Sequence, residues 1–235
     1  MDPVKISVLH ATYRRPEKAV ATMEHWMNSA VNPAQIEYIF ICNADDETAP
    51  NLAVGASQFI PQIVVIRADV TSSAPAWNAG SNNAKGKLLV QASDDMFAPP
   101  LWDELLLSRV ADNGGLGEPM VIGVSDGYRK DRLCCTAICT TAYRDMEGHF
   151  LFPGYRSMFS DDEFTIRAIG HAADGEAKFV EARDLVFKHE HHYHNKDVPL
   201  DATYQHQNSG EAYAQGSKLF VERNQRLINR GFRTW

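Results

Sequence analysis

The sequence predicts a single α/β domain built on a mainly parallel sheet flanked by helices, with a small antiparallel part. Apolar runs alternate with amphipathic stretches through the first hundred residues, and this alternation is typical of βαβ units. The chain has 235 residues, 44% of them hydrophobic, which is enough to bury the core of one domain of this class. We therefore expect no second folding unit, and no internal repeat is evident.

The first half of the chain holds the regular part of this alternation. Residues 17–30 carry apolar side chains at helical spacing, and residues 74–86 predict a helix that ends at Gly86. Short apolar runs predict four strands, at residues 5–10, 36–43, 62–68 and 87–93. Helical connections between successive strands favour parallel pairing.

The second half is less regular. The sequence DDEFTIRAIG predicts a helix at 161–170, and a polar stretch containing Gly and Asn at 195–210 predicts a mobile loop. The C-terminal segment 211–235 contains a predicted helix over 211–232, whose weak apolar face packs on the domain or on a partner. A homo-oligomer formed through this helix is one expectation. Strands are predicted at residues 119–125, 132–141 and 184–194.

Composition and the N-terminal sequence bear on partners and location. A formal charge of −7 disfavours broad binding to nucleic-acid phosphates, although it leaves a local basic patch open. The chain begins directly with a strand and has no apolar stretch long enough for a signal peptide or a transmembrane anchor, so we expect a cytoplasmic protein. Four cysteines lie in or beside apolar runs and predict buried, reduced thiols: Cys42, Cys134, Cys135 and Cys139.

Polar side chains follow the first two predicted strands. Thr12, Tyr13 and Arg14 stand where a dinucleotide-binding protein has a Gly-rich turn, and they offer a hydroxyl, an aromatic face and a guanidinium to a nucleotide. Asn43 and Asp45 follow the second strand and can accept hydrogen bonds from a base or ribose. The alternatives are a solvated loop and ordinary turn chemistry. Both groups would lie at the same edge of a parallel sheet.

Asp94 and Asp95 follow the apolar run 88–90 and give the sharpest functional signal. Carboxylates at the carboxyl edge of a sheet are suited to hard divalent cations. Adjacent residues of an extended chain point to opposite faces, so we assign Asp95 to the metal and Asp94 to ribose or to positioning. The alternative is a polar loop and helix cap before Pro99 and Pro100.

An acidic cluster, 160–163, opens the predicted helix at 161–170. The helix dipole favours carboxylates at this position, so the cluster can be a purely structural cap. A carboxylate that points into a cleft can instead serve as a general base. We choose Asp161 for this role, with Asp162 as the second choice.

The sequence HEHHYH places four histidines within six positions: His189, His191, His192 and His194. In a strand the first two share one face and the last two share the other, so at most two can converge on one ion. The density of imidazoles, in a chain that also offers paired carboxylates, favours a metal role, with an independent zinc site as a lesser alternative.

Together these segments resemble the family 2 glycosyltransferases, which have the GT-A fold, over about residues 4–194. The most specific part is WNAGSNNAKGKLLVQASDDMFAPP, residues 77–100, which is similar to the family's Asn-x-Gly-x-x-x-Ala-x-Gly helix followed by a strand and an Asp-x-Asp-type motif. FSDDEFTIRA resembles the later Glu-Asp-x-Glu-Leu-x-x-Arg signature, with Asp161 at the Asp position. Ala92 and Ser93 stand where many members begin the first motif with Asp.

The resemblance implies a set of site residues. Asp161 would be the general base, Asp95 would hold Mn²⁺ or Mg²⁺, and His189, with His191 as a further candidate, would complete the ion's protein ligands. The implied contacts to the donor are Thr12, Tyr13 and Arg14 in the nucleotide pocket, Asn43 or Asp45 at the base, Asp94 at the ribose, and Asn78 in the motif helix. Residues 1–100 would form the nucleotide-binding half and 101–194 the acceptor and catalytic half.

The resemblance also implies an activity, the transfer of a sugar from a nucleotide-diphosphate donor to an acceptor hydroxyl, with inversion. A UDP-sugar is the expected donor, and the acceptor could be a glycan, a protein, a lipid-linked saccharide or a modified nucleic-acid base. Two other functions stay open. One is a nucleotidyltransferase of similar fold, for which HATYRRP is a poor match because a Gly-rich basic loop is expected there. The other is a non-catalytic nucleotide-sugar-binding protein, favoured if Asp161 and Asp162 both face solvent.

Overall fold

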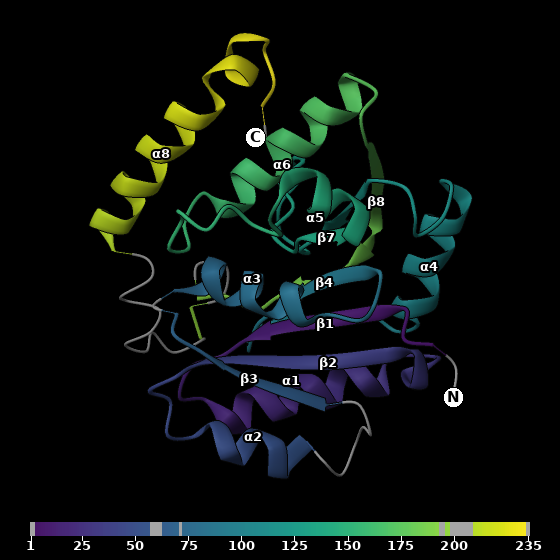
Figure 1. The fold of residues 1–235 in the computed structure, drawn as a ribbon, viewed down its shortest axis with the longest axis vertical. Coiled ribbons are helices and arrows are strands. Elements are labelled where there is room, and N and C mark those ends of the chain that lie inside the picture. Colours follow the sequence, from purple (N-terminus) through teal and green to yellow (C-terminus); the bar gives the residue numbers. More distant parts are fainter. Residues whose placement is uncertain (1–2, 57–62, 71, 193–195, 198–208, 234–235) are drawn as a thin grey trace.

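The computed structural model describes residues 3–56, 63–70, 72–192, 196–197 and 209–233. Its centre is a seven-stranded sheet in the order β3-β2-β1-β4-β7-β6-β8 (Figure 1). The first four strands are parallel, β7 is antiparallel to both its neighbours, and β8 is parallel to β6. The strands are β1 (Ile6–Ala11), β2 (Ile36–Asn43), β3 (Ile63–Ala68), β4 (Leu88–Ala92), β6 (Met120–Ser125), β7 (Ile138–Thr140) and β8 (Lys178–Val186).

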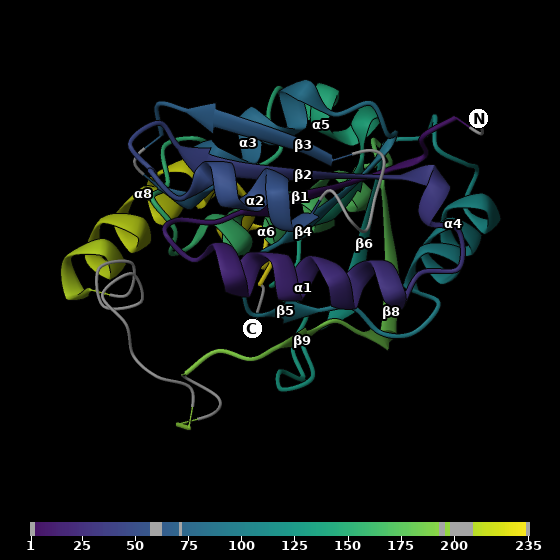
Figure 2. The ribbon, with the colours of Figure 1, turned by 90° about the horizontal axis from the view of Figure 1, so that it is seen from below.

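Helices cover both faces of the sheet (Figures 1 and 2). One face packs against α1 (Pro16–Asn28), α2 (Ala49–Ala56) and α4 (Trp102–Asp112), whose buried residues include Met23, Leu52 and Leu106. The other packs against α3 (Ser73–Asn83), α5 (Thr141–Glu147) and α6 (Ser160–Ala173), and α8 (Gly210–Asn229) lies along α6. A 3₁₀ turn, η1 (Pro33–Gln35), precedes β2. The predicted α/β class with a mainly parallel sheet is therefore confirmed.

A second, two-stranded sheet lies at the edge where the main strands end. It pairs β5 (Met96–Phe97) with β9 (Lys188–His189) in antiparallel register, with Met96 opposite His189. This pairing brings the histidine-rich segment to the loop that follows β4. Two segments that are more than 90 positions apart in the chain thus share one site, and the small antiparallel part that the sequence predicted is present.

Two of the predicted strands are wrong in their bounds. Of residues 132–141 only Ile138–Thr140 form a strand, because the N–H of Cys134 donates to Thr165 Oγ1 and that of Ala137 to Gln91 Oε1, instead of to a neighbouring strand. The strand predicted at 184–194 begins earlier, at Lys178. It ends at Val186, and within the described residues the chain after His189 forms no strand.

The predicted helices are mostly confirmed, but Gly86 has a different role from the predicted one. The helix predicted at 74–86 ends at Asn83, so Gly86 does not cap it. A Cβ on Gly86 would lie 2.5 Å from the carbonyl carbon of Ile6, and the glycine is needed because the chain passes directly against β1. The predictions at 17–30, 161–170 and 211–232 correspond to α1, α6 and α8. The sequence analysis missed α2, α4 and α5.

Most of the predicted mobile loop, 195–210, lies outside the described residues, and so does His194. The four cysteines are free, with Cys42, Cys134 and Cys139 buried and Cys135 half-buried.

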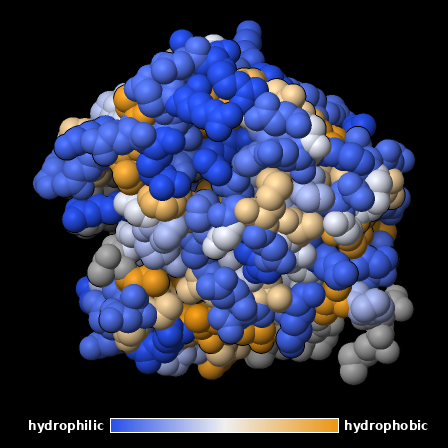
Figure 3. Space-filling model, turned by 45° about the horizontal axis from the view of Figure 1, so that its top comes forward, coloured by the Kyte–Doolittle hydropathy of each residue, from blue (hydrophilic) through white to orange (hydrophobic). Residues whose placement is uncertain are grey.

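Among the described residues, no helix combines the length and the apolar character that a membrane crossing needs. The face seen in Figure 3 is mostly hydrophilic, with small scattered apolar areas. Assembly through α8, whose large exposed apolar residues are Tyr213 and Val221, stays a prediction.

A buried ion-pair cluster fastens α5 to α6. Glu147 pairs with the Arg167 guanidinium, whose Nη2 lies 2.9 Å from Oε1, and with His171, whose Nε2 lies 2.5 Å from the same oxygen. Burial raises the pKa of Glu147, but these two partners outweigh it and hold that pKa at about 2. The cluster fixes the orientation of α6, the helix that carries Asp161.

Glu147→Gln is expected to lower the free energy of unfolding by about 3 kcal/mol at neutral pH. A carboxylate whose pKa is depressed in the folded state contributes stability above its ordinary pKa of 4.5, and loses it as the pH falls toward about 2. Urea denaturation at a series of pH values should therefore show the two proteins converging below pH 4.5. The matched control is Glu176→Gln, the other partner of His171, whose exposed carboxylate should contribute little.

Candidate functional site

Side chains from α1 and α3 hold the loop after β4 in a fixed course. Trp77 Nε1 donates to the Ala92 carbonyl at 3.0 Å, Thr22 Oγ1 to the Asp94 carbonyl at 3.0 Å, and Trp26 Nε1 to the Met96 carbonyl at 2.7 Å. Each bond ties a backbone oxygen of this segment to a side-chain donor of a neighbouring helix. The loop that presents Asp94 and Asp95 is therefore rigidly placed before any ligand arrives.

Asp94 belongs to a buried chain of polar side chains beneath the sheet edge. Its Oδ1 lies 2.9 Å from His10 Nε2, and His10 Nδ1 lies 2.7 Å from the Tyr38 hydroxyl. Arg15 Nη1 lies 3.5 Å from the other carboxylate oxygen. His10 is fully buried and the Asp94 side chain is only 6% exposed. This arrangement fixes the Asp94 carboxylate at the end of β4. The sequence analysis missed both His10 and Tyr38.

Asp95 faces the histidine-rich segment. Its Oδ2 lies 3.5 Å from His189 Nε2, and Ser93 Oγ donates to its Oδ1 at 2.5 Å. The Glu190 N–H donates to the Asp95 carbonyl at 2.8 Å, so backbone and side chain both connect the two segments. The rings of His189 and His191 have their centroids 5.3 Å apart. The structure thus places Asp95 against His189, and His191 beside His189.

The predicted metal fits this group only if the substrate supplies ligands as well. Among the described residues no three His, Cys, Asp or Glu side chains are placed to hold an ion together. One or two carboxylates plus substrate phosphates is, however, the usual way in which Mg²⁺ is bound beside a nucleotide. The Asp95 carboxylate, with His189 Nε2 at 3.5 Å, meets that requirement. A separate zinc site finds no support among the described residues.

The corner after β1 and the corner after β2 lie against each other, as predicted. The Tyr13 hydroxyl donates to Asp45 Oδ2 at 3.2 Å, and Arg14 lies over the Tyr13 ring at 4.9 Å. Asp46, which the sequence analysis passed over, accepts the Arg14 N–H at 2.7 Å and is 1% exposed. Burial raises the pKa of Asp46, but its hydrogen bonds outweigh this and lower it. The buried Thr12 hydroxyl has no hydrogen-bond partner among the described residues.

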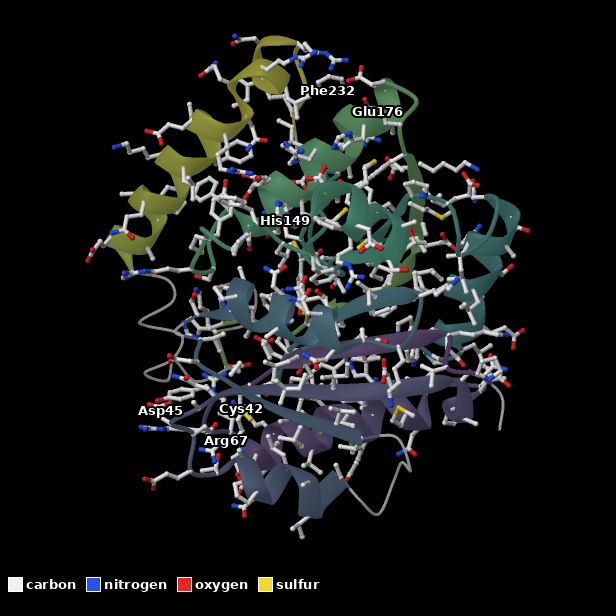
Figure 4. The ribbon with its side chains drawn as sticks, viewed as in Figure 1. Cys42, Asp45, Arg67, His149, Glu176 and Phe232 are labelled. Carbon is white, nitrogen blue, oxygen red and sulfur yellow. The ribbon has the colours of Figure 1, made fainter. Side chains whose placement is uncertain are left out.

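Figure 4 shows Asp45, Cys42 and Arg67 together at this end of the sheet. Arg67 donates to the carbonyls of Ala44 and Asp46, so it fixes the corner that carries Asp45. Asn43, at the end of β2, uses its side-chain oxygen to accept the Ala44 N–H at 2.8 Å. That bond is ordinary turn chemistry, and it leaves the amide nitrogen of Asn43 for other contacts.

Asn78 has a structural role. Its Nδ2 donates to the Leu151 carbonyl at 2.5 Å and to the Ala74 carbonyl at 3.0 Å, and its Oδ1 accepts the Phe150 N–H at 2.8 Å. These bonds fasten α3 to the segment before α6. The amide is committed to the backbone, so we do not include Asn78 among the donor contacts proposed below.

Asp161 stands in the first turn of α6 and is half-buried, as is Asp162. Its Oδ1 accepts the Asp162 N–H at 3.1 Å, and its carbonyl accepts Thr165 Oγ1 at 2.7 Å. Burial raises the pKa of Asp161. Backbone hydrogen bonds and the charges of Arg129 and His189 lower this pKa, but by less, so it stays above its ordinary value. The carboxylate therefore takes part in the helix start and also interacts with the histidine that contacts Asp95.

Three further residues of the site were missed by the sequence analysis: Asp126, Arg129 and Cys135. Asp126 directly follows β6 and accepts the N–H groups of Tyr128 and Arg129 at 2.9 and 2.8 Å, while its carbonyl accepts the His189 N–H at 3.2 Å. Burial raises the pKa of the Cys135 thiol, and the charges of Asp161 and Asp126 raise it further. The thiol stays protonated. The available signal was the polar strand end Ser125-Asp126-Gly127.

The electrostatics of His189 link the two predicted parts of the site. Burial lowers the pKa of this imidazole, but a hydrogen bond to Asp95 and the charges of Asp95, Asp126 and Asp161 together raise it. Carboxylates from three different parts of the chain thus act on His189. The predicted metal ligand Asp95 and the predicted base Asp161 are both within electrostatic range of this one side chain.

A small cavity of about 10 Å³ lies elsewhere, between α5 and α6. It is lined in part by Tyr143 and His149, whose hydroxyl and Nδ1 have no hydrogen-bond partner among the described residues. Its size and these two unpartnered polar atoms suit a single buried water. Figure 4 shows His149 well away from Asp45 and the donor edge, so this cavity is not the ligand site.

The sheet order, the crossover helices and the acidic loop after β4 define the GT-A fold. TarS of S. aureus, residues 1–349, superposes with a TM-score of 0.64 at 11% identity, covering 93% of this chain and 72% of that one. The same TarS fragment in complex with UDP-GlcNAc gives 0.62 at 12% identity, covering 97% and 73%. The mannosyltransferase PcManGT of Pyrobaculum calidifontis, in complex with GDP-Man and Mn²⁺, gives 0.60 at 9% identity, covering 96% and 76%.

These similarities are structural. No family model matches the chain, and no curated protein matches it in sequence. The chain spans 43% of the longer TarS structure. At such low identities the likeness shows the fold, and the activity is inferred from the site.

Proposed function

We propose that the chain is a glycosyltransferase that moves a sugar from a nucleotide-diphosphate donor to an acceptor hydroxyl, with Asp161 as the general base. The observation that carries the proposal is the position of His189, whose ring lies 3.5 Å from Asp95 Oδ2 and within electrostatic range of Asp161. A donor held at Asp95 would thus lie beside a carboxylate of raised pKa. The fold shared with TarS, solved with UDP-GlcNAc, and with the mannosyltransferase PcManGT, solved with GDP-Man and Mn²⁺, supports the same conclusion.

The reaction gives separate tasks to the proposed base and to the residues that would hold the donor. The acceptor oxygen attacks the anomeric carbon, its proton passes to the Asp161 carboxylate, and the bond to the donor phosphate breaks with release of the nucleoside diphosphate. In-line displacement of this kind inverts the anomeric centre. A base that is partly desolvated has a pKa closer to the working pH, which favours proton transfer.

Asp95 and His189 would hold the divalent cation. Mn²⁺ or Mg²⁺, when bound there, would act as a Lewis acid that stabilises the charge of the departing diphosphate. Thr12, Tyr13 and Arg14, with Asn43 or Asp45, would bind the nucleoside, and Asp94 would contact the ribose. The buried, unpartnered hydroxyl of Thr12 supports a polar ligand at this corner.

We propose a UDP-sugar as the donor. The solved relatives bind UDP-GlcNAc, UDP or GDP-Man, so guanosine donors belong in the same test. The proposed acceptor is a hydroxyl of a glycan, a protein, a lipid-linked saccharide or a modified nucleic-acid base. The half-buried positions of Asp161 and Asp162 speak against the non-catalytic alternative, which required both to face solvent.

The test incubates the protein with labelled nucleotide sugars, Mn²⁺ and an acceptor panel, and measures the released products. We expect metal-dependent release of a nucleoside diphosphate, fastest with a UDP-sugar. Release of pyrophosphate from a nucleoside triphosphate and a sugar phosphate would instead indicate a nucleotidyltransferase. Donor binding without either product, across the whole panel, would contradict the proposal and support a binding protein.

A further inference from the structure

The C-terminal helix α8 approaches the start of α6 unusually closely at one glycine. A Cβ placed on Gly216 would lie 2.7 Å from the carbonyl oxygen of Met158 and 2.9 Å from Cδ2 of Phe159. Met158 and Phe159 immediately precede Ser160 and Asp161 in the chain. Because a backbone carbonyl cannot swing aside as a side-chain tip can, any larger residue at position 216 must displace this segment or α8 itself.

Phe159 itself is held in a strained conformation by α8. Its φ of 69° lies in the left-handed region, which is unfavourable for a non-glycine residue. Its ring packs against Tyr213 and Phe220 of α8, with centroids 5.0 and 5.9 Å away. These contacts hold the turn that starts α6 and sets the direction of Asp161.

One turn further along α6, a buried ionic cluster fastens the two helices together. Glu163, which is 2% exposed, accepts Arg223 Nε at 2.9 and 3.0 Å, Asn224 Nδ2 at 3.1 Å and the Tyr155 hydroxyl at 2.6 Å. The Arg223 guanidinium also covers the Phe152 ring at 3.2 Å. Such a network is costly to disturb, because removing one partner leaves a charge buried and unpaired.

The far end of the same helix pair is joined more loosely. A Cβ on Gly170 would meet only the tip of the Leu227 side chain, at 2.7 Å from Cδ2, and that tip can move. Beyond it, Arg230 pairs with Asp174 at 2.6 and 2.8 Å on the surface. Figure 1 shows α8 lying along α6 from one end to the other. The tight contacts are therefore concentrated where α6 begins.

We propose that α8 is a positioning element for the general base: Gly216, Tyr213 and Phe220 hold the turn at Met158–Ser160, and through it the carboxylate of Asp161. This inference rests on the proposed role of Asp161 in sugar transfer. It assigns the C-terminal helix, which lies outside the segments that resembled the glycosyltransferase family, a part in the acceptor step. Donor binding, which is proposed to depend on other residues, should not depend on it.

Three glycine substitutions test the proposal. Gly216→Ala should lower kcat for transfer roughly 10- to 100-fold, because a displacement of about 1 Å at a reacting group costs that much. The Kd for donor plus Mn²⁺, measured by calorimetry, should change less than about twofold. Gly170→Ala, at the loose end of the same interface, should keep kcat within about twofold even where it lowers Tm. Gly210→Ala, where a Cβ meets nothing within 4 Å, should change neither.

If Gly216→Ala does not fold, Tyr213→Ala tests the same proposal. Tyr213 is 55% exposed, so its removal should leave the fold intact while it frees the Phe159 ring. We expect kcat to fall several-fold with donor Kd unchanged. Val221→Ala, an exposed apolar truncation on the same helix, is its matched control and should behave as wild type. Wild-type kcat in every folded variant at positions 213 and 216 would overturn the proposal, and so would an equal loss in Gly170→Ala.

Amide hydrogen exchange separates failure of this inference from failure of the proposed function. Exchange at residues 158–162 should accelerate in Gly216→Ala and Tyr213→Ala, but not in Gly170→Ala or Val221→Ala. This measurement needs no sugar transfer. If the wild type transfers no sugar to any acceptor, the proposed function fails, and faster exchange would still show that α8 orders the Asp161 turn. Unchanged exchange together with unchanged kcat would overturn the inference while leaving the glycosyltransferase intact.

Discussion

Asp161→Asn is expected to abolish sugar transfer and at the same time to stabilise the fold at neutral pH. A general base contributes roughly 10²- to 10⁴-fold to a rate, and asparagine cannot accept the proton, so kcat should fall by that factor. Donor affinity should stay at the wild-type level, because the donor is held by other residues. Both quantities can be measured on one preparation, the first by diphosphate release and the second by calorimetry.

The gain in stability follows from the raised pKa of Asp161. A carboxyl group whose pKa is higher in the folded protein than its ordinary 3.8 stabilises the fold while it is protonated. That contribution is lost as the pH rises from 3.8 through the raised folded value. Melting temperatures of the wild type should therefore fall over this window relative to those of Asp161→Asn. The acid limb of the transfer rate should lie above pH 3.8 for the same reason.

Asp162→Asn is the matched control. The two carboxylates are neighbours in the same helical turn, and a raised pKa is found for Asp161. We expect Asp162→Asn to retain most of the transfer activity and to gain no comparable stability. The reverse result, in which Asp161→Asn turns over normally and Asp162→Asn does not, would move the base to the second residue.

The sheet and the edge that carries the candidate site could be predicted from the sequence because buried parallel strands have continuous apolar sequences. Ile36–Asn43 and Leu88–Ala92 are of this kind, and each is followed by polar side chains. Parallel strands end at one edge, so Thr12, Asp45 and Asp94 could be placed together without knowing any contact. The structure shows these corners in contact, with Tyr13 donating to Asp45.

Elements that depend on distant partners could not be predicted in the same way. Strand β8 is partly exposed and carries charges among its apolar residues, so its start at Lys178 gave a weak periodic signal. Helix α5 is a seven-residue segment stabilised largely from outside, by Arg167 and His171 around Glu147. Short helices depend on tertiary packing more than on their own propensity. Their existence is decided by residues that follow much later in the chain.

The same limit applies to the site. A strand-end carboxylate is visible in a sequence, but the buried His10 that orients Asp94 looks like any residue of an apolar strand. Asp126 looks like a turn residue, although it supports His189 through its backbone and its charge. Residues expected to touch ligand follow a local pattern, whereas the residues that position them are defined only by the folded chain.

Asp95→Asn is expected to remove the metal dependence of donor binding. The carboxylate oxygen that lies 3.5 Å from His189 Nε2 is the proposed ligand, and a neutral amide binds a hard cation far less well than a carboxylate. We expect Mn²⁺ to strengthen donor binding to the wild type by roughly 100-fold or more, and to change binding to the variant by less than about threefold. Titration of a UDP-sugar with and without Mn²⁺ measures both.

Asp94→Asn is the matched control, because it removes a carboxylate at the adjacent position without touching the proposed ion. Asp94 is held by His10 and Arg15 and should contact the ribose, so its loss should weaken donor binding both with and without Mn²⁺. The ratio of the two affinities should stay near the wild-type value. Wild-type metal dependence in Asp95→Asn would place the cation elsewhere, and loss of that dependence in Asp94→Asn alone would exchange the two roles. The two neighbouring substitutions thus predict different outcomes for one measured ratio, a loss in Asp95→Asn and no change in Asp94→Asn, and a merely damaged loop would not separate them.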